Sequence, residues 1–473
     1  MSDKMMAKQI LGGTVADGAG NNFDIVILGG GSGGYACALR AAQLGKSVAI
    51  VEKSKVGGTC LHNGCIPTKA LLHAAEVADA SRESESFGVR STFDGIDMPK
   101  VNAYKDGVVD KLYKGLQGLV KAGGITVVEG EGKLVGPKTV EVDGKQYTGT
   151  NLVLASGSYA RTLPGLEIGG RVLTSDEALM MTEVPARVVI IGGSVIGVEF
   201  ASVWKSFGAE VTIVEALPTL VPLEDPSLSK QLERAFRKRK ITFKTGVKFS
   251  GVKQTDDGVT VSLENGETID TDLVLVAVGR GPNSAGLGYE EAGITVDRGW
   301  VPTDERLRTN VDGVFAVGDL VPGLQLAHRG FAHGIFVAEE IAGLAPQPVI
   351  DSGIPRVTYC DPEIASVGLT EPQAREKYAD VEVQEYNLGG NGKSQILQTA
   401  GSVKLVREKD GPIVGVHMIG ARYGEQVGEA SLMVNWEAYP EDVAQFIHAH
   451  PTQNEALGEA ALALAGKPLH SHA

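Results

Sequence analysis

The stretch that decides the fold is DIVILGGGSGGYACALRAAQLGKSVAIVE, residues 24–52. Its first five residues, Asp24 followed by four apolar residues, form a short run that is typical of a buried parallel strand. The glycines at 29–34 then open an Ala-rich helical segment, and a second apolar run ends at Glu52. This order predicts a strand, a Gly-rich turn, a helix and a second strand, the β-α-β arrangement that can bind a dinucleotide.

The same pattern occurs a second time at residues 188–215, where VVII precedes GGSVIG and the second strand ends at Glu215. The distance from Gly192 to Glu215 is 23 positions, the same as from Gly29 to Glu52. A single Gly-rich turn is often an ordinary loop between a strand and a helix. Two complete copies favour two nucleotide-binding units, and this internal repeat is the strongest architectural signal in the chain.

Each motif uses its glycines for a physical reason. The first glycine makes the tight turn, the second lets backbone N–H groups approach a pyrophosphate, and the third allows close packing of the helix. The pyrophosphate lies at the helix N-terminus, and the terminal carboxylate accepts hydrogen bonds from a ribose. Ser194 stands at the middle-glycine position of the second copy, so we expect a slightly less close approach there.

The rest of the chain extends this pattern and then changes character. Apolar strands that end in glycine are expected at 152–157 and 273–279, and Asp319 follows another strand. Beyond residue 350 the sequence alternates between polar and apolar positions and contains amphipathic helices near 425–435 and 453–465. The fold class is therefore α/β, with two Rossmann-like nucleotide-binding domains followed by an α+β C-terminal domain.

Composition excludes several classes of protein. The 473 residues suggest about three domains, and 44 basic against 58 acidic residues give a net charge of −14. Nucleic acids and anionic membranes need clustered Lys and Arg, so neither is expected as a partner. No apolar stretch approaches a membrane span. Four cysteines are too few for a scaffold held by disulfides, and the sequence indicates no metal site. Residues 1–22 carry no targeting signal. We expect a disordered leader at 1–22 and a cytoplasmic protein.

A candidate redox centre lies in the segment GGTCLHNGCIPTK, which contains Cys60 and Cys65. Five positions apart in a regular helix, two thiols are too far from each other for a disulfide. Asn63-Gly64 supplies a local distortion that could bring them within range, and a helix N-terminus stabilises a thiolate. The alternative is a pair of buried structural thiols. Their position directly after a nucleotide-binding unit favours the redox interpretation.

A candidate acid–base pair lies near the other end of the chain, where His450 is followed by Glu455. A histidine that is oriented by a carboxylate can exchange protons near neutral pH. The residues alone leave a structural histidine about as probable as a catalytic one. A thiol reaction favours the catalytic role, because one proton must be moved for every thiolate formed. The neighbouring His448 is expected to be structural or to line the substrate site.

These features occur in the order that is characteristic of the FAD-dependent pyridine-nucleotide disulfide oxidoreductases, and the chain resembles that family from residue 23 to about 466. The resemblance implies a homodimer in which the histidine of one subunit serves the disulfide of the other. It also implies these domains: FAD-binding at 23–158, NAD-binding at 159–281, a central domain completing the FAD site at 282–350, and a C-terminal dimerisation domain at 351–473.

The resemblance also implies roles for individual residues. Cys65 would lie against the flavin and Cys60 would exchange with substrate. Lys69 would lie near flavin N5 and pair with Glu199. Glu52 would bind the adenosine ribose of FAD, Asp319 the ribityl chain, and Ala327 would face the isoalloxazine. The full set of expected cofactor-binding residues is Gly29, Gly31, Ser32, Gly34, Glu52, Gly58, Thr59, Lys69, Gly132, Ser156, Gly157, Ser158, Gly192, Gly193, Ile196, Gly197, Glu199, Glu215, Phe249, Gly279, Asp319, Gln325, Leu326, Ala327 and His328.

Three segments, at 326–328, 361–370 and 448–452, most resemble family members that oxidise protein-bound dihydrolipoamide to lipoamide and reduce NAD. That activity would pass electrons from the dithiol through the Cys60–Cys65 disulfide and FAD. No lipoyl domain precedes residue 23, so the lipoyl group is expected on a partner, a 2-oxoacid dehydrogenase complex or the glycine cleavage system.

Two alternatives remain. The first is a related reductase that uses NADPH on glutathione, a similar disulfide or mercury. Glu215 would repel a 2′-phosphate, no arginine pair follows it, and the end of the chain lacks the cysteine pair of a mercuric reductase. The second is a non-catalytic flavin-binding subunit. The presence of Cys60, Cys65, His450 and Glu455 argues against that.

Overall fold

The computed structural model describes residues 20–470, so most of the leader expected at 1–22 lies outside the described residues. Asn22 corrects that expectation, because it already pairs with Thr148 as the first residue of β1. The chain divides into two compact units, which we describe separately. The first joins the residues up to 62 with 109–159 and 280–349, and the second joins 63–108 with 160–279 and 350–473.

The first unit is built on a seven-stranded sheet with the order β3-β2-β1-β6-β5-β4, in which β17 also pairs with β6. The pairs that join β1 to β2, β1 to β6 and β6 to β17 are parallel, as the buried apolar runs predicted. The strands are β1 (Asn22–Leu28), β2 (Val48–Glu52), β3 (Thr126–Glu129), β4 (Lys133–Gly136), β5 (Thr139–Val142), β6 (Lys145–Leu154) and β17 (Val314–Ala316).

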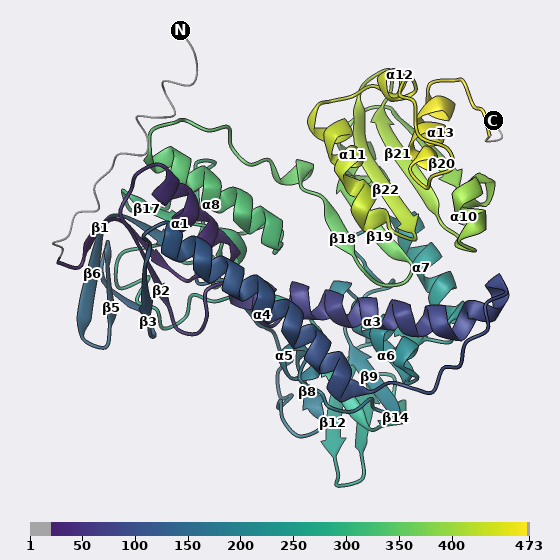
Figure 1. The fold of residues 1–473 in the computed structure, drawn as a ribbon, viewed down its shortest axis with the longest axis horizontal. Coiled ribbons are helices and arrows are strands. Elements are labelled where there is room, and N and C mark those ends of the chain that lie inside the picture. Colours follow the sequence, from purple (N-terminus) through teal and green to yellow (C-terminus); the bar gives the residue numbers. More distant parts are fainter. Residues whose placement is uncertain (1–19, 471–473) are drawn as a thin grey trace. The chain divides into compact units, whose positions relative to one another are not determined.

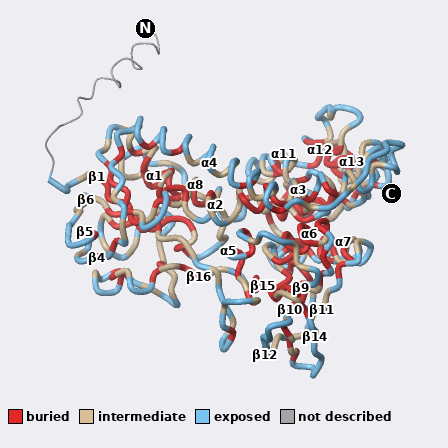
Figure 2. The backbone as a smooth tube through the Cα atoms, turned by 60° about the horizontal axis from the view of Figure 1, so that its bottom comes forward, coloured by how far each residue is buried: buried red, intermediate tan, exposed pale blue. Residues whose placement is uncertain are grey.

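Helix α1 (Ser32–Gln43) leaves the end of β1 and packs along α8 (Ala327–Ile341), and the two helices lie side by side in Figure 1. The carboxyl-terminal residues of the central strands β1 and β6 are buried, whereas α4 (Met98–Ala122) is largely exposed (Figure 2). The remaining short elements of this unit are α2 (Gly58–His62), β7 (Ser158–Ala160) and β16 (Arg280–Pro282).

The second unit repeats the motif in a five-stranded sheet with the order β11-β10-β9-β15-β8. A three-stranded sheet, β12-β13-β14, accompanies it. The elements are α3 (Cys65–Glu83), β8 (Val172–Leu173), α5 (Ser175–Ala178), β9 (Arg187–Ile191), α6 (Val195–Phe207), β10 (Glu210–Glu215), α7 (Pro226–Lys238), β11 (Thr242–Thr245), β12 (Phe249–Gln254), β13 (Val259–Leu263), β14 (Thr268–Thr271) and β15 (Leu273–Val276).

One part of the chain packs differently from the expected domain boundaries. Residues 63–108 were expected in the domain at 23–158, but they belong to the second unit. Leu71 and Ala75 of α3 are buried in one hydrophobic cluster with Phe200 and Val203 of α6. The apolar face of α3 is therefore covered by the helix of the second motif.

The C-terminal part of the second unit is an antiparallel sheet with the order β18-β19-β22-β21-β20 and helices against it, as the alternating pattern predicted. Its elements are β18 (Arg356–Thr358), β19 (Glu363–Gly368), α9 (Glu371–Lys377), β20 (Val381–Asn387), α10 (Gly392–Ile396), β21 (Ser402–Glu408), β22 (Ile413–Gly420), α11 (Tyr423–Asn435), α12 (Pro440–Val443) and α13 (Glu455–Leu464).

Candidate active site

The two Gly-rich turns have nearly identical backbones. The first glycine of each has a positive φ, +107° at Gly29 and +109° at Gly192. A Cβ on the third glycine, Gly34 or Gly197, would lie 1.9 Å from the carbonyl oxygen of the first. No side chain fits at that distance, so both motifs require glycine where the helix crosses its own turn.

The terminal carboxylates of the two motifs are held in the same way. Glu52 accepts hydrogen bonds from the N–H of Gly30 at 2.7 Å and of Ser54 at 2.9 Å. Glu215 accepts them from Gly193 at 2.6 Å and Leu217 at 2.7 Å. These bonds fix each carboxylate beside its Gly-rich turn and leave further acceptor capacity for a ribose hydroxyl.

The N-termini of α1 and α6 fit a pyrophosphate. Neither helix has a side-chain cap or an acidic residue in its first turn, so the first backbone N–H groups and the helix dipole are available to an anion. Among the residues described, from 20 to 470, no atom other than those of Gly31 and its chain neighbours lies within 4 Å of the place where a Cβ on Gly31 would stand. Ser194 has φ −89° and ψ −168°, close to the −70° and −171° of Gly31, so the serine leaves the backbone in place.

A polar cluster in the first unit joins several residues that the sequence assigned to FAD. Ser158 Oγ donates to Asp319 at 2.6 Å, and Arg280 donates to Ser158 Oγ at 2.7 Å. Ser156 Oγ donates to the carbonyl of Asn283 at 2.6 Å and accepts a hydrogen bond from the buried Tyr289 at 2.9 Å. The sequence analysis missed Arg280 and Tyr289. Arg280 directly follows the expected site residue Gly279, a signal that could have found it.

The other expected cofactor residues lie in both units. A Cβ on Gly132 would come within 2.6 Å of Val51, so close packing against β2 already requires this glycine. Gln325 and Leu326 precede α8, whereas Ala327 and His328 are its first two residues. Gly58 and Thr59 open α2, and Phe249 begins β12.

Cys60 and Cys65 lie on two consecutive helices rather than on one. Cys60 belongs to α2, which ends at His62, and Cys65 is the first residue of α3. Gly64 has φ −151° and ψ −112°, which interrupts the helix where Asn63-Gly64 was expected to distort it. The first turn of α3 has neither a side-chain cap nor an acidic residue, so its dipole favours a thiolate at Cys65.

Lys69 lies one turn along α3 and forms an ion pair with Glu199 of α6, as expected. Its Nζ is 3.0 and 2.9 Å from the two carboxylate oxygens. Burial lowers the Lys69 pKa, but Glu199, with smaller contributions from Cys65 and Tyr359, outweighs burial and raises it. The side chain of Lys69 is therefore a cation within electrostatic reach of Cys65.

His450 and Glu455 form the expected pair, with His450 Nδ1 2.7 Å from Glu455 Oε1. The second oxygen of Glu455 accepts the Thr452 N–H at 2.6 Å. Burial raises the Glu455 pKa, but the Thr452 N–H and the imidazole outweigh burial and lower it, so the carboxylate is charged. The His450 side chain is 76% exposed, with its second ring nitrogen available to a proton donor.

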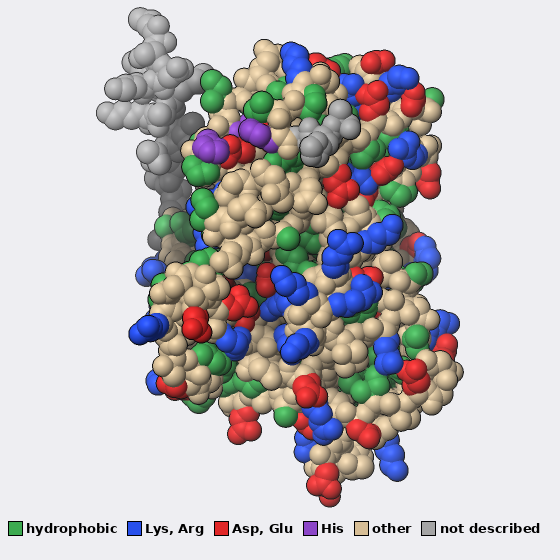
Figure 3. Space-filling model, turned by 90° about the vertical axis from the view of Figure 1, so that its right-hand side faces the viewer, with side chains coloured by type: hydrophobic (Ala, Val, Ile, Leu, Met, Phe, Trp, Pro, Cys, Tyr) green, Lys and Arg blue, Asp and Glu red, His purple; other side chains and the backbone are tan. Residues whose placement is uncertain are grey.

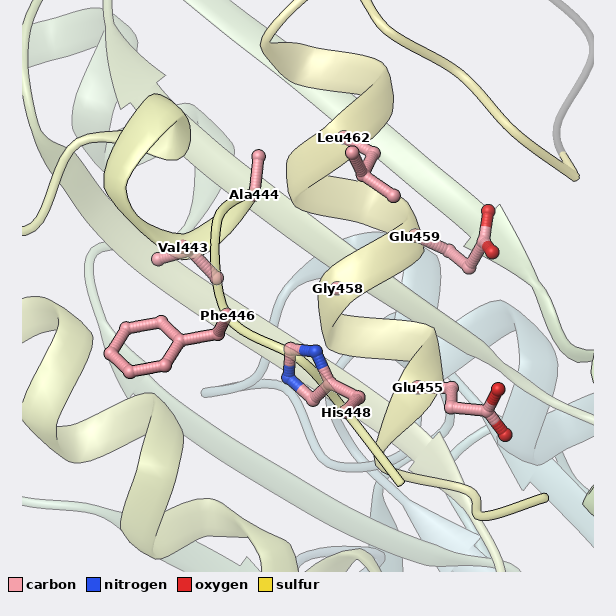
Figure 4. A pocket seen from close by; sticks show the side chains of 8 residues that line it. All are labelled: Val443, Ala444, Phe446, His448, Glu455, Gly458, Glu459 and Leu462. Carbon is pink, nitrogen blue, oxygen red and sulfur yellow. The ribbon is translucent and has the colours of Figure 1, made fainter. Parts of the chain in front are cut away.

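A second histidine–glutamate pair lies beside the first. His448 Nε2 is 2.9 Å from Glu429, which also accepts a hydrogen bond from Asn454. The hydrogen bond with Glu429 raises the His448 pKa. His448 and Glu455 line a cavity of about 140 Å³ with Val443, Ala444, Phe446, Gly458, Glu459 and Leu462 (Figure 4). The sequence analysis missed Glu429, because nothing in sequence links it to a histidine 19 positions away.

Acidic and basic side chains both occur over the face shown in Figure 3, and several Lys and Arg side chains lie close together near its middle. None of the helices described between residues 20 and 470 is long and apolar enough to cross a membrane.

Two mononucleotide motifs, a cysteine pair on consecutive helices and a histidine–carboxylate pair define a nucleotide-dependent oxidoreductase that works through thiols. The comparisons with known proteins agree. Residues 23–334 match the model of the pyridine nucleotide-disulphide oxidoreductases, and 354–461 match the dimerisation domain of the same family. The chain belongs to the pyridine nucleotide-disulphide oxidoreductase family, whose cofactors are FAD and NAD.

Its relatives narrow the class further. A Bacillus subtilis protein named dihydrolipoyl dehydrogenase is 42% identical over 95% of this chain and 99% of its own. A mitochondrial dihydrolipoyl dehydrogenase of Arabidopsis thaliana is 39% identical, over 97% and 93%. The crystal structure of LpdA from Mycobacterium tuberculosis matches with a TM-score of 0.86 and 25% identity, over 93% of this chain and 99% of that chain.

Proposed function

We propose that the chain oxidises protein-bound dihydrolipoamide to lipoamide and reduces NAD to NADH. The observation that carries this proposal is the pairing of His450 with Glu455 in a chain that also has Cys60 and Cys65 on consecutive helices. The identity of about 40% with relatives named dihydrolipoyl dehydrogenase, over nearly the full length, supports it.

In the proposed reaction, His450 accepts the proton of a substrate thiol while Glu455 stabilises the imidazolium. The substrate thiolate attacks the sulfur of Cys60, the Cys60–Cys65 bond breaks, and Cys65 leaves as a thiolate. The second substrate thiol then displaces Cys60 from the mixed disulfide and closes lipoamide. The substrate loses two electrons and two protons: the cysteine pair gains the two electrons, His450 holds the first proton, and the released Cys60 sulfur takes up the second.

Lys69 has a defined part in this scheme, because its ammonium stabilises the negative charge that develops on Cys65. The bound FAD supplies the two-electron chemistry that links the dithiol to NAD. The carboxylates, Gly-rich turns and polar cluster described above are the proposed cofactor contacts, together with the remaining residues of the expected set.

The matched dimerisation domain supports a homodimer, and the proposed active site is shared across its subunits. The 76% exposure of His450 in one chain is compatible with an imidazole that serves the partner. The proposed partners are lipoyl domains of a 2-oxoacid dehydrogenase or glycine cleavage complex, and the proposed location is the cytoplasm. We also propose FAD-binding, NAD-binding, central and dimerisation domains as a functional division, in which residues 282–350 complete the FAD site. This division differs from the two compact units at residues 63–108, which pack in the second unit.

The test replaces His450 with glutamine in the holoenzyme. We expect FAD and the dimer to be retained, because neither depends on proton transfer by His450. Turnover of dihydrolipoamide should fall by ~10²–10⁴, the usual scale for one positioned acid–base group. Transfer of electrons from NADH to an artificial acceptor should largely survive, because that route bypasses the disulfide. Steady-state rates of the two reactions provide the measurement.

Two further variants serve as comparisons. Glu455→Gln should show a milder loss, because the imidazole remains but is less well oriented. His448→Gln should retain more lipoamide turnover than His450→Gln, since its ring is bound to Glu429 and packs against Gly458. If His448→Gln abolishes turnover while His450→Gln spares it, the assignment of the base is wrong.

A further inference from the structure

The Lys69–Glu199 ion pair has a third member, Tyr359, which directly follows strand β18 of the C-terminal sheet. The Tyr359 backbone N–H donates to Glu199 Oε1 at 2.9 Å, the same oxygen that lies 3.0 Å from Lys69 Nζ. The Lys69 ammonium also lies 4.8 Å from the centroid of the Tyr359 ring. One residue therefore contacts the anion through its backbone and the cation through its side chain.

The position of Tyr359 is fixed by its neighbours. Two residues later, the Asp361 N–H donates to Ser202 Oγ at 3.2 Å, so the segment after β18 follows α6 for about one turn beyond Glu199. On the side of α11, a Cβ on Gly424 would lie 2.9 Å from Tyr359 Cε1. The ring edge thus lies directly against the backbone of Gly424 and has little room to move.

Glu199 alone does not fix the position of the Lys69 ammonium, so a further neighbour such as the Tyr359 ring is needed. The ammonium has three N–H donors on a flexible four-carbon stem, and the two oxygens of Glu199 satisfy only two of them. A third of the Lys69 side-chain surface is exposed, whereas Glu199 is almost fully buried. An aromatic face attracts a cation through its quadrupole, and burial raises the Tyr359 pKa, so its hydroxyl is neutral.

We propose that Tyr359 is a positioning residue that holds the Lys69 ammonium within reach of Cys65, so that packing of the C-terminal sheet sets the charge beside the reactive sulfur. This proposal deepens the proposed function, on which it rests for the role of Cys65. It assigns Tyr359 no contact with substrate or nucleotide. The aromatic ring is the essential part, because every substitution except proline retains the backbone N–H that donates to Glu199.

The experiment compares Tyr359→Leu with Tyr359→Phe in the reduced holoenzyme. The rate of Cys65 alkylation by iodoacetamide is measured against pH by peptide mass spectrometry, and dihydrolipoamide turnover is measured in parallel. Tyr359→Leu should move the alkylation midpoint to higher pH and lower turnover ~3–30-fold, the range of a lost cation–π contact. Tyr359→Phe should match the parent, because it keeps the aromatic face.

The matched control is Tyr378→Leu, which removes another ring that faces a lysine, with Lys377 Nζ 5.1 Å from its centroid. This variant should leave Cys65 alkylation unchanged. The proposal fails if Tyr359→Leu keeps the parental profile, or if Tyr359→Phe shifts as far as Tyr359→Leu.

If Tyr359→Leu does not fold, Gly424→Ala tests the same contact, because its methyl group must displace the ring. It should shift the alkylation midpoint in the same direction, and an unchanged midpoint overturns the proposal. Alkylation of Cys65 requires no lipoyl substrate. A parent enzyme that fails to oxidise dihydrolipoamide would therefore contradict the proposed function, while a shifted midpoint in Tyr359→Leu would still support the positioning role.

Discussion

The two nucleotide motifs share a turn but differ in what covers the helix that follows. At the start of α1, Gly33 is buried, and a Cβ on Gly334 of α8 would lie 2.2 Å from its carbonyl oxygen. The corresponding residues of α6 are Val195, which is 38% exposed, and the partly exposed Ile196. Helix α8 thus covers the start of α1 through close backbone contact. The start of α6, in the second motif, is partly exposed at the corresponding positions.

This difference suits the two cofactors of the family. FAD remains bound through many turnovers and benefits from a site that is rigid before the nucleotide arrives, because pre-organisation reduces the entropy lost on binding. NAD must enter and leave during every turnover, so a more accessible helix start favours rapid exchange. Similar Gly-rich turns therefore do not imply equal residence times of the two nucleotides.

Disruption of the contact between α1 and α8 should have the largest effect on the difference between the two nucleotide sites. Gly334→Ala places a methyl group 2.2 Å from the Gly33 carbonyl oxygen and 2.8 Å from the Cys37 nitrogen, so the two helices must separate. We expect protein that is largely depleted of FAD and has a lower melting temperature. The ratio of flavin to protein absorbance and a thermal melt provide the measurements.

Gly115→Ala is the matched control for that variant. Gly115 lies in α4 with open space around its Cβ position, so alanine should leave FAD content unchanged and slightly stabilise the helix. Full FAD occupancy in Gly334→Ala would show that closure by α8 does not retain the cofactor.

Substitution of the carboxylates Glu52 and Glu215 should distinguish the two nucleotide sites, with a smaller effect than Gly334→Ala. Glu52→Gln should speed FAD loss, whereas Glu215→Gln should raise the KM for NADH and leave FAD bound. Each change should amount to about 10–100-fold, the scale of a charge-assisted hydrogen bond. Glu215→Gln should also narrow the preference for NADH over NADPH, because the parent carboxylate repels a 2′-phosphate.

Dialysis for FAD and steady-state kinetics for both nucleotides distinguish these outcomes. Loss of FAD from Glu215→Gln would contradict the assignment of the second motif to the exchanging nucleotide. Equal efficiency of the parent enzyme with NADH and NADPH would contradict the role of Glu215 in selecting NAD.

The smallest effect is expected at the middle position of the second turn. Ser194 already has the backbone conformation of Gly31, so Ser194→Gly should change the KM for NADH by less than about threefold, within ~0.6 kcal/mol. A change of tenfold or more in steady-state kinetics would mean that the serine hydroxyl itself takes part in binding.

Local sequence predicted much of the fold and site because the relevant contacts span few residues. The Gly-rich turns, the carboxylates ending β2 and β10, and the helix break between Cys60 and Cys65 all follow from neighbouring residues. His450 and Glu455 are five positions apart, and their hydrogen bond was predicted for the same reason.

The features that sequence did not predict join distant segments. Nothing near Gly33 indicates that Gly334 will pack on it, and nothing near Lys69 indicates Tyr359. The assignment of α3 to the second unit likewise depends on apolar contacts with α6, more than 100 positions away. Such contacts depend on complementary shape, which a single sequence does not display.

The covering of α1 by α8 also affects how the chain is made. A ribosome that adds ~5–20 residues per second reaches Gly334 roughly 15–60 s after Gly33. Until then α1 lacks its helical neighbour, and Leu152 to Leu154 of β6 lack their partners in β17. The motif synthesised first is therefore completed late, and its apolar surface is available to chaperones, or to aggregation, throughout that interval.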